Sequence, residues 1–142
     1  MGTRSLTVFM DGEREIAVMY RQYDGHPSSH GEELKAFLSG FKVVNGYGRD
    51  KTKVANGMGC LAAQIVKHFK KEGPGSFYLH AAGTRDCGEE YIYTVSASEK
   101  GNVHLKCQAG AMTFFGMPGS KQESMPTLYD GPVDFIEAQN KA

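Results

Sequence analysis

Cys60 is the residue of this chain whose surroundings best suit a nucleophile. It ends the run of residues 56–60, which opens a segment with helical periodicity. A thiol in the first turn of a helix is stabilised as the thiolate by unpaired backbone N–H groups and by the positive end of the helix dipole. His80 and His30 are the candidate bases, in the general layout of papain-like cysteine peptidases. These residues suggest a thiol-dependent hydrolase or transferase, and the alternative is a small side chain packed where the chain crosses the helix end.

Five further residues are candidates for binding a ligand. They are Arg4, Tyr20, Asp24, Arg85 and Asp86. Arg85 and Asp86 lie in a charged connection between two expected strands, and exposed connections on a rigid sheet often carry binding residues. A merely solvated connection has the same composition. Arg4, Arg49 and Arg85 together would suit an anionic, nucleotide-like ligand.

Basic residues also gather in and before the second expected helix. With Tyr47 they would form a patch for a phosphate-bearing ligand. The set comprises Arg49, Lys51, Lys53, Lys67, Lys70 and Lys71. A solvated helix face would look the same, so both interpretations stay open.

Metal and cofactor motifs are weak or absent in the sequence. Asp24, His26 and His30 are side chains of the types that hold transition metals. Pro27 places His26 before the helix, however, so the two histidines are not the i, i+4 pair of a helical metal motif. We expect Asp24 and Ser28 to brace a turn instead. No P-loop, dinucleotide fingerprint, zinc helix or serine elbow occurs, and we predict neither metal nor cofactor.

The strands that would position these residues follow from runs of β-favouring residues. We expect strands at residues 4–10, 15–23, 76–80, 90–98, 102–108 and 112–115. Asp11 and Gly12 predict a hairpin between the first two strands. A three-residue bulged turn at Asp11, Gly12 and Glu13 would place Val8 opposite Ile16, which matches the apolar faces of the two strands.

Two helices are expected between these strands. Ser29 and Glu32 form the pattern of a capping box and predict a helix over residues 29–39. A second helix over residues 57–71 follows from one apolar stripe at helical spacing. The stripe consists of Met58, Leu61, Ala62, Ile65 and Phe69. Residues 41–56 between the helices show no regular pattern, and residues 46–53 are expected to form a surface loop.

These elements predict the α+β class. We expect an antiparallel sheet of about six strands, an N-terminal hairpin plus a C-terminal meander, with two main helices on one face and a short C-terminal helix. Residues 1–116 would form a single domain. Residues 117–142 would form a mobile loop followed by the short helix, which Pro132 would begin.

Composition narrows the classes of function. The chain has 142 residues, with 16 Lys and Arg against 16 Asp and Glu, so its formal net charge is zero. This balance argues against a nucleic-acid partner. The absence of a long apolar run and of a signal-peptide pattern predicts a cytoplasmic protein without a membrane segment. Three cysteines without a close pair are typical of reduced thiols.

Several motifs together resemble a family of small uncharacterised proteins from bacteriophage and bacterial genomes. They are the opening MGTRSLT, the segment YRQYDGHP, the block NGMGCLAAQ at residues 56–64 and the segment DCGEEY. The resemblance covers about residues 1–108. It implies a bacterial cell or a phage-infected host as the setting, and it implies no activity.

We therefore expect a small non-enzymatic binding or interaction module of phage or bacterial accessory type. A binding module needs no catalytic base, whereas a thiol enzyme with Cys60 as nucleophile needs a histidine base that the sequence does not specify. A binder of an anionic nucleotide-like ligand is a further alternative. The partner would be an unidentified protein or small ligand, and a homo-oligomer is compatible with the sequence.

Overall fold

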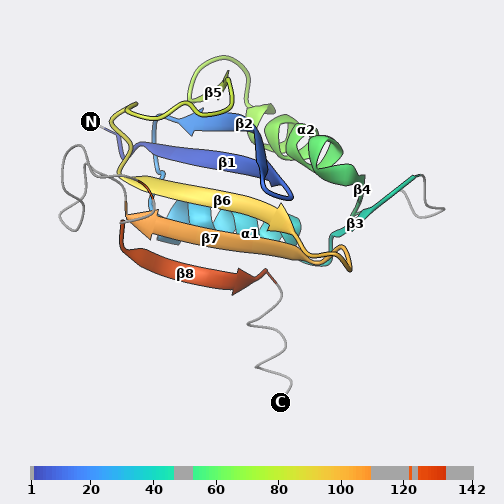
Figure 1. Cartoon of the computed structure of the whole chain (residues 1–142). Coiled ribbons are helices and arrows are strands. Elements are labelled where there is room, and N and C mark those ends of the chain that lie inside the picture. Colours follow the sequence, from blue (N-terminus) through green and yellow to red (C-terminus); the bar gives the residue numbers. More distant parts are fainter. Residues whose placement is uncertain (1, 47–52, 110–121, 123–124, 134–142) are drawn as a thin grey trace.

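The computed structural model of the chain describes residues 2–46, 53–109, 122 and 125–133. Its main sheet has six strands in the order β5-β2-β1-β6-β7-β8 (Figure 1). They are β1 (Ser5–Asp11), β2 (Arg14–Arg21), β5 (Phe77–His80), β6 (Tyr91–Ala97), β7 (Val103–Ala109) and β8 (Thr127–Pro132). The helices are α1 (Glu32–Leu38) and α2 (Gly57–Lys70), and β3 (Lys42–Val44) pairs with β4 (Val54–Asn56) in parallel. The α+β class and a mostly antiparallel sheet of six strands are confirmed.

The hairpin of β1 and β2 is present, but its irregularity lies elsewhere than expected. The turn has two residues between the paired ends of the strands, so the bulged turn at residues 11–13 is wrong. The extra residue is Ile16, inside β2, where the register shifts. Beyond this bulge Val8 pairs with Val18. Because a shift of one residue moves a strand's side chains to the other face, the bulge brings the apolar residues of both strands onto matching faces.

One neighbouring pair of strands is parallel, which the expected antiparallel sheet did not contain. β1 runs parallel to β6, and β5 points in the same direction as both. Residues 81–90 therefore return along the sheet before β6 begins, as a parallel arrangement requires. The Gly83 N–H donates to Glu15 near the hairpin turn. The Glu90 N–H donates to the Arg4 carbonyl at the start of β1 (2.8 Å). An irregular segment thus takes the place of a crossover helix.

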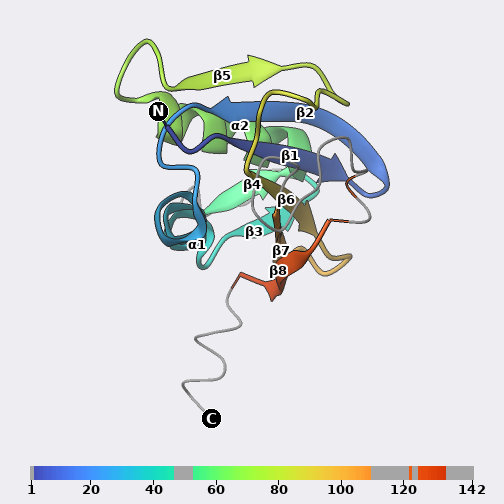
Figure 2. The ribbon, with the colours of Figure 1, turned by 90° about the vertical axis from the view of Figure 1, so that its left-hand side faces the viewer.

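The helix side of the sheet carries one continuous hydrophobic cluster. It joins buried residues of α1 and α2 to Phe9, Met19, Tyr93 and Leu105 of the sheet. Figures 1 and 2 show α1 on one side of β6 and β7. The predicted stripe of α2 is confirmed, since all five of its residues are buried.

The opposite face of the sheet carries a second, smaller cluster. Its buried members are Leu6, Val8, Val18, Ile92 and Met125. Cys87 of the 81–90 connection and Tyr20 of β2 pack against it. The irregular connection therefore contributes to covering a sheet face that has no helix on it within the described residues.

The first helical segment begins earlier than expected and lacks the predicted cap. A π-helical turn, Pro27–Gly31, leads directly into α1, and His26 is its N-cap residue without a side-chain cap hydrogen bond. The capping box of Ser29 and Glu32 is therefore wrong. Proline fits this first turn because its missing N–H would have no partner there. The turn leaves His30 fully buried.

Two segments without a predicted strand contain strands. β3 and β4 flank the expected surface loop at residues 46–53, most of which lies outside the described residues, and β8 lies within the segment 117–142 that was expected to form a loop and a helix. Asp130, Gly131 and Pro132 end β8 and do not begin a helix. The edge of β7 supplies the hydrogen-bond partners of β8, and such distant pairing leaves little trace in the local sequence.

Some expected elements lie outside the described residues. These are the strand at residues 112–115, most of the loop at residues 117–124 and any helix after Val133. Within the described part of the chain, neither helix combines the length and apolar character that crossing a membrane requires.

Candidate functional site

A groove between α1 and α2 is the candidate site. It consists of three adjoining hollows, and His68 lines all of them. The outer hollow, of about 790 Å³, is lined by Phe37, Gln64, Lys67, His68, Lys70 and Lys71. A middle hollow of about 630 Å³ runs along α1 to Phe41 and Lys53. An inner hollow of about 350 Å³ ends at Arg21, between Phe69 and Phe77.

A pair of stacked rings joins α1 to α2 across the groove. The rings of Phe37 and His68 have centroids 4.3 Å apart and planes inclined by 24°. Phe41 extends the aromatic surface, with its centroid 5.2 Å from that of Phe37. Burial, reinforced by the positive charge of Lys71 and opposed by Glu33, lowers the pKa of His68. The groove therefore has an apolar, aromatic base and a histidine that favours its neutral form.

Lysines surround the outer hollow, and they fall into two groups. Lys70 is held by the carbonyls of Gly75 and Phe77, at 3.0 and 2.8 Å from its Nζ. Lys67 and Lys71 are exposed, and neither makes an ion pair within the described residues. They lie one turn apart at the C-terminal end of α2, where Lys71 is the C-cap residue, and like charges at this spacing repel each other. An anion placed between them would relieve that repulsion.

Arg21 at the inner end of the groove is almost completely buried, with its side chain 9 % exposed. Its Nε donates to the carbonyl of Tyr23 (2.6 Å), and its Nη1 contacts Glu33 Oε2 (2.7 Å) and His30 Nδ1 (3.0 Å). The guanidinium carbon lies 4.9 Å from the ring centroid of Phe77. Sequence reasoning did not select this residue.

His30 is a structural residue in this arrangement. Because an arginine can only donate, Nδ1 of His30 accepts from Arg21, and its Nε2 donates to Thr7 Oγ1 (2.7 Å). Burial, with the positive charge of Arg21, lowers the pKa of His30 to about 3. The ring is therefore neutral near pH 7, and both of its nitrogens are already engaged.

The candidate nucleophile does not meet either of its candidate bases. The Cys60 thiol accepts a hydrogen bond from Gln64 of the next helical turn (3.4 Å). His30 touches α2 at Phe69 (5.1 Å between ring centroids), nine positions along the helix and about 13 Å away at 1.5 Å per residue. His80 contacts Tyr20 (6.1 Å), which packs on the sheet face opposite α2.

Four of the five candidate ligand-binding residues lie in or beside the 81–90 connection, and Asp24 lies at the turn before the first helical segment. Arg85 is held by Glu15 (2.8 Å) and by the side-chain oxygen of Gln122 (2.7 Å). These contacts secure the 81–90 connection on the sheet. The hydrogen bonds from Arg85 hold the pKa of Glu15 below its usual range. Arg85 therefore has a structural partner, and Asp86 beside it is exposed with a positive φ of 61°.

Arg4 and Tyr20 lie close enough for the charge of Arg4 to act on the Tyr20 hydroxyl. Burial raises the pKa of Tyr20, and the charge of Arg4 opposes that shift. The Tyr20 hydroxyl donates to Gln22. Asp24 is exposed at the turn before the first helical segment, with a φ of 61°. Arg49, the third arginine of the nucleotide hypothesis, lies outside the described residues.

The three thiols should differ in their reactivity toward Ellman's reagent. Cys107 is 4 % exposed, and burial raises its pKa to about 11. We expect native protein to react at Cys60 first and at Cys87 more slowly, because burial and the carboxylates of Glu89 and Asp86 raise the pKa of Cys87. Cys107 should react only after unfolding. Peptide mapping by mass spectrometry would identify each labelled thiol.

The corresponding Cys60→Ser variant is the control for this labelling experiment. It should remove the fastest phase and leave the other two unchanged. Labelling of Cys107 in native protein at the rate of Cys60 would contradict the burial of Cys107.

Some of the residues that line the groove were predicted from the sequence as a basic patch. Lys53, Lys67, Lys70 and Lys71 of the expected basic patch all line it, whereas Tyr47, Arg49 and Lys51 lie outside the described residues. Gln64, Lys67, His68 and Lys71 recur at i, i+3, i+4 and i+7, which is the spacing of one helix face. That spacing could have identified His68. No local signal points to Phe37 or Arg21, since their roles depend on distant partners.

The described residues contain no group of three or more histidine, cysteine, aspartate and glutamate side chains arranged to hold a metal. Comparison with protein-family models, curated proteins and solved structures finds no match to this chain. The resemblance to phage and bacterial proteins therefore stays a prediction.

Proposed function

We propose that this protein is a non-catalytic binding module that holds a small anionic ligand with a flat ring in the α1–α2 groove. One observation carries the proposal: the outer hollow combines the stacked pair of Phe37 and His68 with the lysines of α2. Binding of this kind needs no nucleophile and no base. It also gives Lys67 and Lys71 a partner of opposite charge.

The ring of the ligand is inferred from the aromatic base of the hollow. Phe37 and His68 are each only partly buried, so their rings remain available to a ligand. Aromatic side chains contribute a large apolar area and favour offset or edge-to-face contact with another ring. A nucleotide has this combination of ring and negative charge, which keeps the anionic nucleotide-like ligand among the candidates.

The anionic character of the ligand is inferred from the rim. Lys67, Lys70 and Lys71 line the outer hollow, and no carboxylate lines it among the described residues. Exposed charges of this kind attract a ligand mainly through long-range electrostatics, which salt screens over about 8 Å at physiological ionic strength. Binding should therefore weaken as salt is added.

The proposal can be tested with the fluorescent anion 8-anilinonaphthalene-1-sulfonate. Its uncharged relative N-phenyl-1-naphthylamine serves as the matched probe without the negative charge. We expect the native protein to bind the anion more tightly than the neutral probe. The double variant Lys67→Glu/Lys71→Glu should weaken binding of the anion by about tenfold, corresponding to about 1.4 kcal/mol. Fluorescence titration at low salt measures both affinities.

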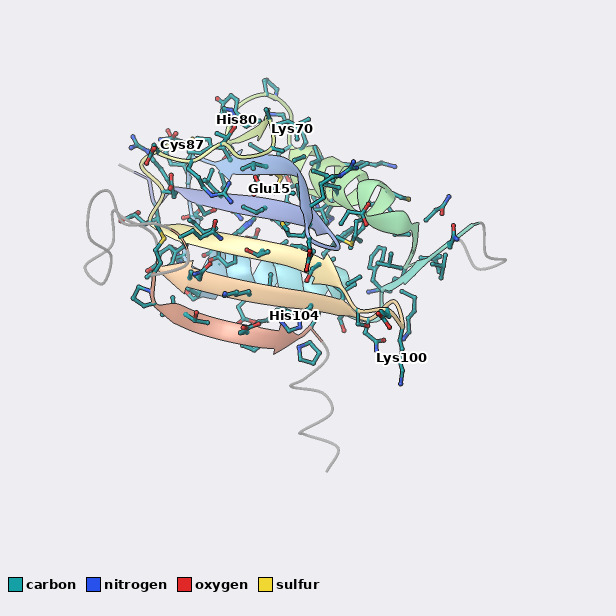
Figure 3. All side chains as sticks on the ribbon, in the orientation of Figure 1. Glu15, Lys70, His80, Cys87, Lys100 and His104 are labelled. Carbon is teal, nitrogen blue, oxygen red and sulfur yellow. The ribbon has the colours of Figure 1, made fainter. Side chains whose placement is uncertain are left out.

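Two further variants complete this experiment. Phe37→Ala should weaken both probes, since it removes the aromatic base of the hollow. Lys100→Glu removes an exposed lysine far from Lys70 of the outer hollow, as Figure 3 shows, and it should leave both affinities unchanged. Equal loss in Lys100→Glu and in the Lys67/Lys71 variant would show that net charge, and not the groove, holds the anion.

Competition then tests whether the ligand is nucleotide-like. Adenosine 5′-monophosphate should displace the bound sulfonate probe, and adenosine should do so less effectively because it lacks the negative charge. Displacement by neither compound would exclude this nucleotide as the ligand while leaving the anionic groove in place.

A further inference from the structure

Arg21 has hydrogen-bonding capacity that the protein itself does not use. A guanidinium carries five N–H donors. The Nε–H and the two hydrogens of Nη1 are accounted for by Tyr23, Glu33 and His30. The two donors of Nη2 have no hydrogen-bond partner within the described residues. The Arg21 side chain is 9 % exposed, and it lines the inner hollow.

The position of this guanidinium is tightly defined. Three hydrogen bonds hold Nε and Nη1, and the rings of Phe77 and Phe69 lie 4.9 and 5.9 Å from the guanidinium carbon. Nη2 is the nitrogen of this group without a hydrogen-bond partner among the described residues. A donor pair held in place in this way is suited to an oxygen acceptor that arrives from outside.

We infer that the inner hollow is an oxyanion subsite, in which Arg21 Nη2 and Lys71 bind the phosphate or carboxylate group of the ligand. The inference rests on the proposed function, because the hollow is the inner end of the same groove. It adds a specific contact for the charged group, whereas the lysines of the rim attract anions without selecting their geometry.

The charges around the inner hollow nearly cancel, so an anion would be held there mainly by directed hydrogen bonds and not by net charge. Arg21 and Lys71 are balanced by Glu33 and Glu72, which also line the hollow. Glu33 is already paired with Arg21 Nη1 at 2.7 Å. The hollow therefore has no excess of positive charge when His68 is neutral. Selection of an oxyanion would come from the fixed direction of the Nη2 donors.

Inorganic phosphate and acetate are the probes for this subsite. They carry no ring, so they report on Arg21 independently of the sulfonate probe used for the groove. In a two-dimensional ¹H–¹⁵N NMR titration of the whole protein, the side-chain Nε–H signal of Arg21 and the backbone N–H signals of His68 and Phe77 should shift and saturate. Saturation by phosphate alone, by acetate alone or by both identifies the group and supports the subsite. An absence of saturable shifts with both anions would overturn it.

Arg21→Lys is the first variant, because it keeps the positive charge and removes the fork of donors. It should weaken the anion by about tenfold or more, read from the backbone signals of His68 and Phe77. Glu33→Gln is the second variant and keeps Arg21 itself. It should strengthen binding severalfold, because a carboxylate that competes with the anion is removed. If Arg21→Lys fails to fold, unchanged or weakened binding in Glu33→Gln overturns the inference.

Lys67→Glu separates this inference from the proposed function. Lys67 lines the outer hollow and does not line the inner one. This variant should weaken the sulfonate probe and leave phosphate or acetate binding at Arg21 nearly unchanged. If the unsubstituted protein binds phosphate or acetate at Arg21 but not the sulfonate probe, the proposed function has failed; if it binds the sulfonate probe but neither small anion, the subsite has failed.

Discussion

Replacing Phe69 with alanine is expected to lower the free energy of unfolding by about 3–5 kcal/mol. Phe69 is 5 % exposed, and its ring packs against those of His30 (5.1 Å) and Phe77 (5.3 Å). Truncation would remove these contacts and leave a cavity beside Arg21. Chemical denaturation followed by circular dichroism measures the loss.

Two other positions on α2 serve as comparisons for Phe69→Ala. Ile65→Ala, on the same buried stripe, should cost about 2–5 kcal/mol. Lys67→Ala, on the exposed face of the helix, should change stability by no more than about 0.5 kcal/mol. Equal losses at Phe69 and Lys67 would contradict the observed orientation of α2.

Acid is expected to destabilise the protein well above the range in which most carboxylates titrate. His30 has an ordinary pKa of 6.5 when unfolded and about 3 in the folded state. Between these values the unfolded chain binds a proton that the folded chain does not, so stability falls as the pH falls. At 1.36 kcal/mol per pKa unit, the loss is about 2 kcal/mol at pH 5 and approaches about 5 kcal/mol near pH 3.

Unfolding free energies between pH 7.5 and pH 5 would test this expectation. His30→Gln removes the titrating group, so most of the slope with pH should disappear even if the variant is less stable overall. His68→Gln is the matched control. The pKa of His68 is lowered in the same direction, but His68 is only partly buried and should account for a smaller part of the slope. An unchanged slope in His30→Gln would contradict the buried neutral histidine.

The repeating patterns of the sequence determined the local elements. The stripe from Met58 to Phe69 recurs at helical spacing, and α2 follows it from Gly57 to Lys70. Periodicity of this kind is a property of residues close together in the sequence, so it can be recognised without knowledge of the fold. The same holds for the hairpin of β1 and β2 and for the strands β5, β6 and β7. The basic character of residues 53–71 was likewise readable from residue type alone.

Contacts between distant residues were decided only by the tertiary structure. The parallel pairing of β1 with β6, the strand β8 on the edge of β7 and the bulge at Ile16 all depend on which segments meet. The candidate site depends even more strongly on contacts between residues that are distant in the sequence. Phe37 of α1 stacks on His68 of α2, and Arg21 of β2 pairs with Glu33 of α1. A side chain's type limits what it can bind. The partners that bury it and orient it are brought to it by packing of the whole chain, which local periodicity does not encode.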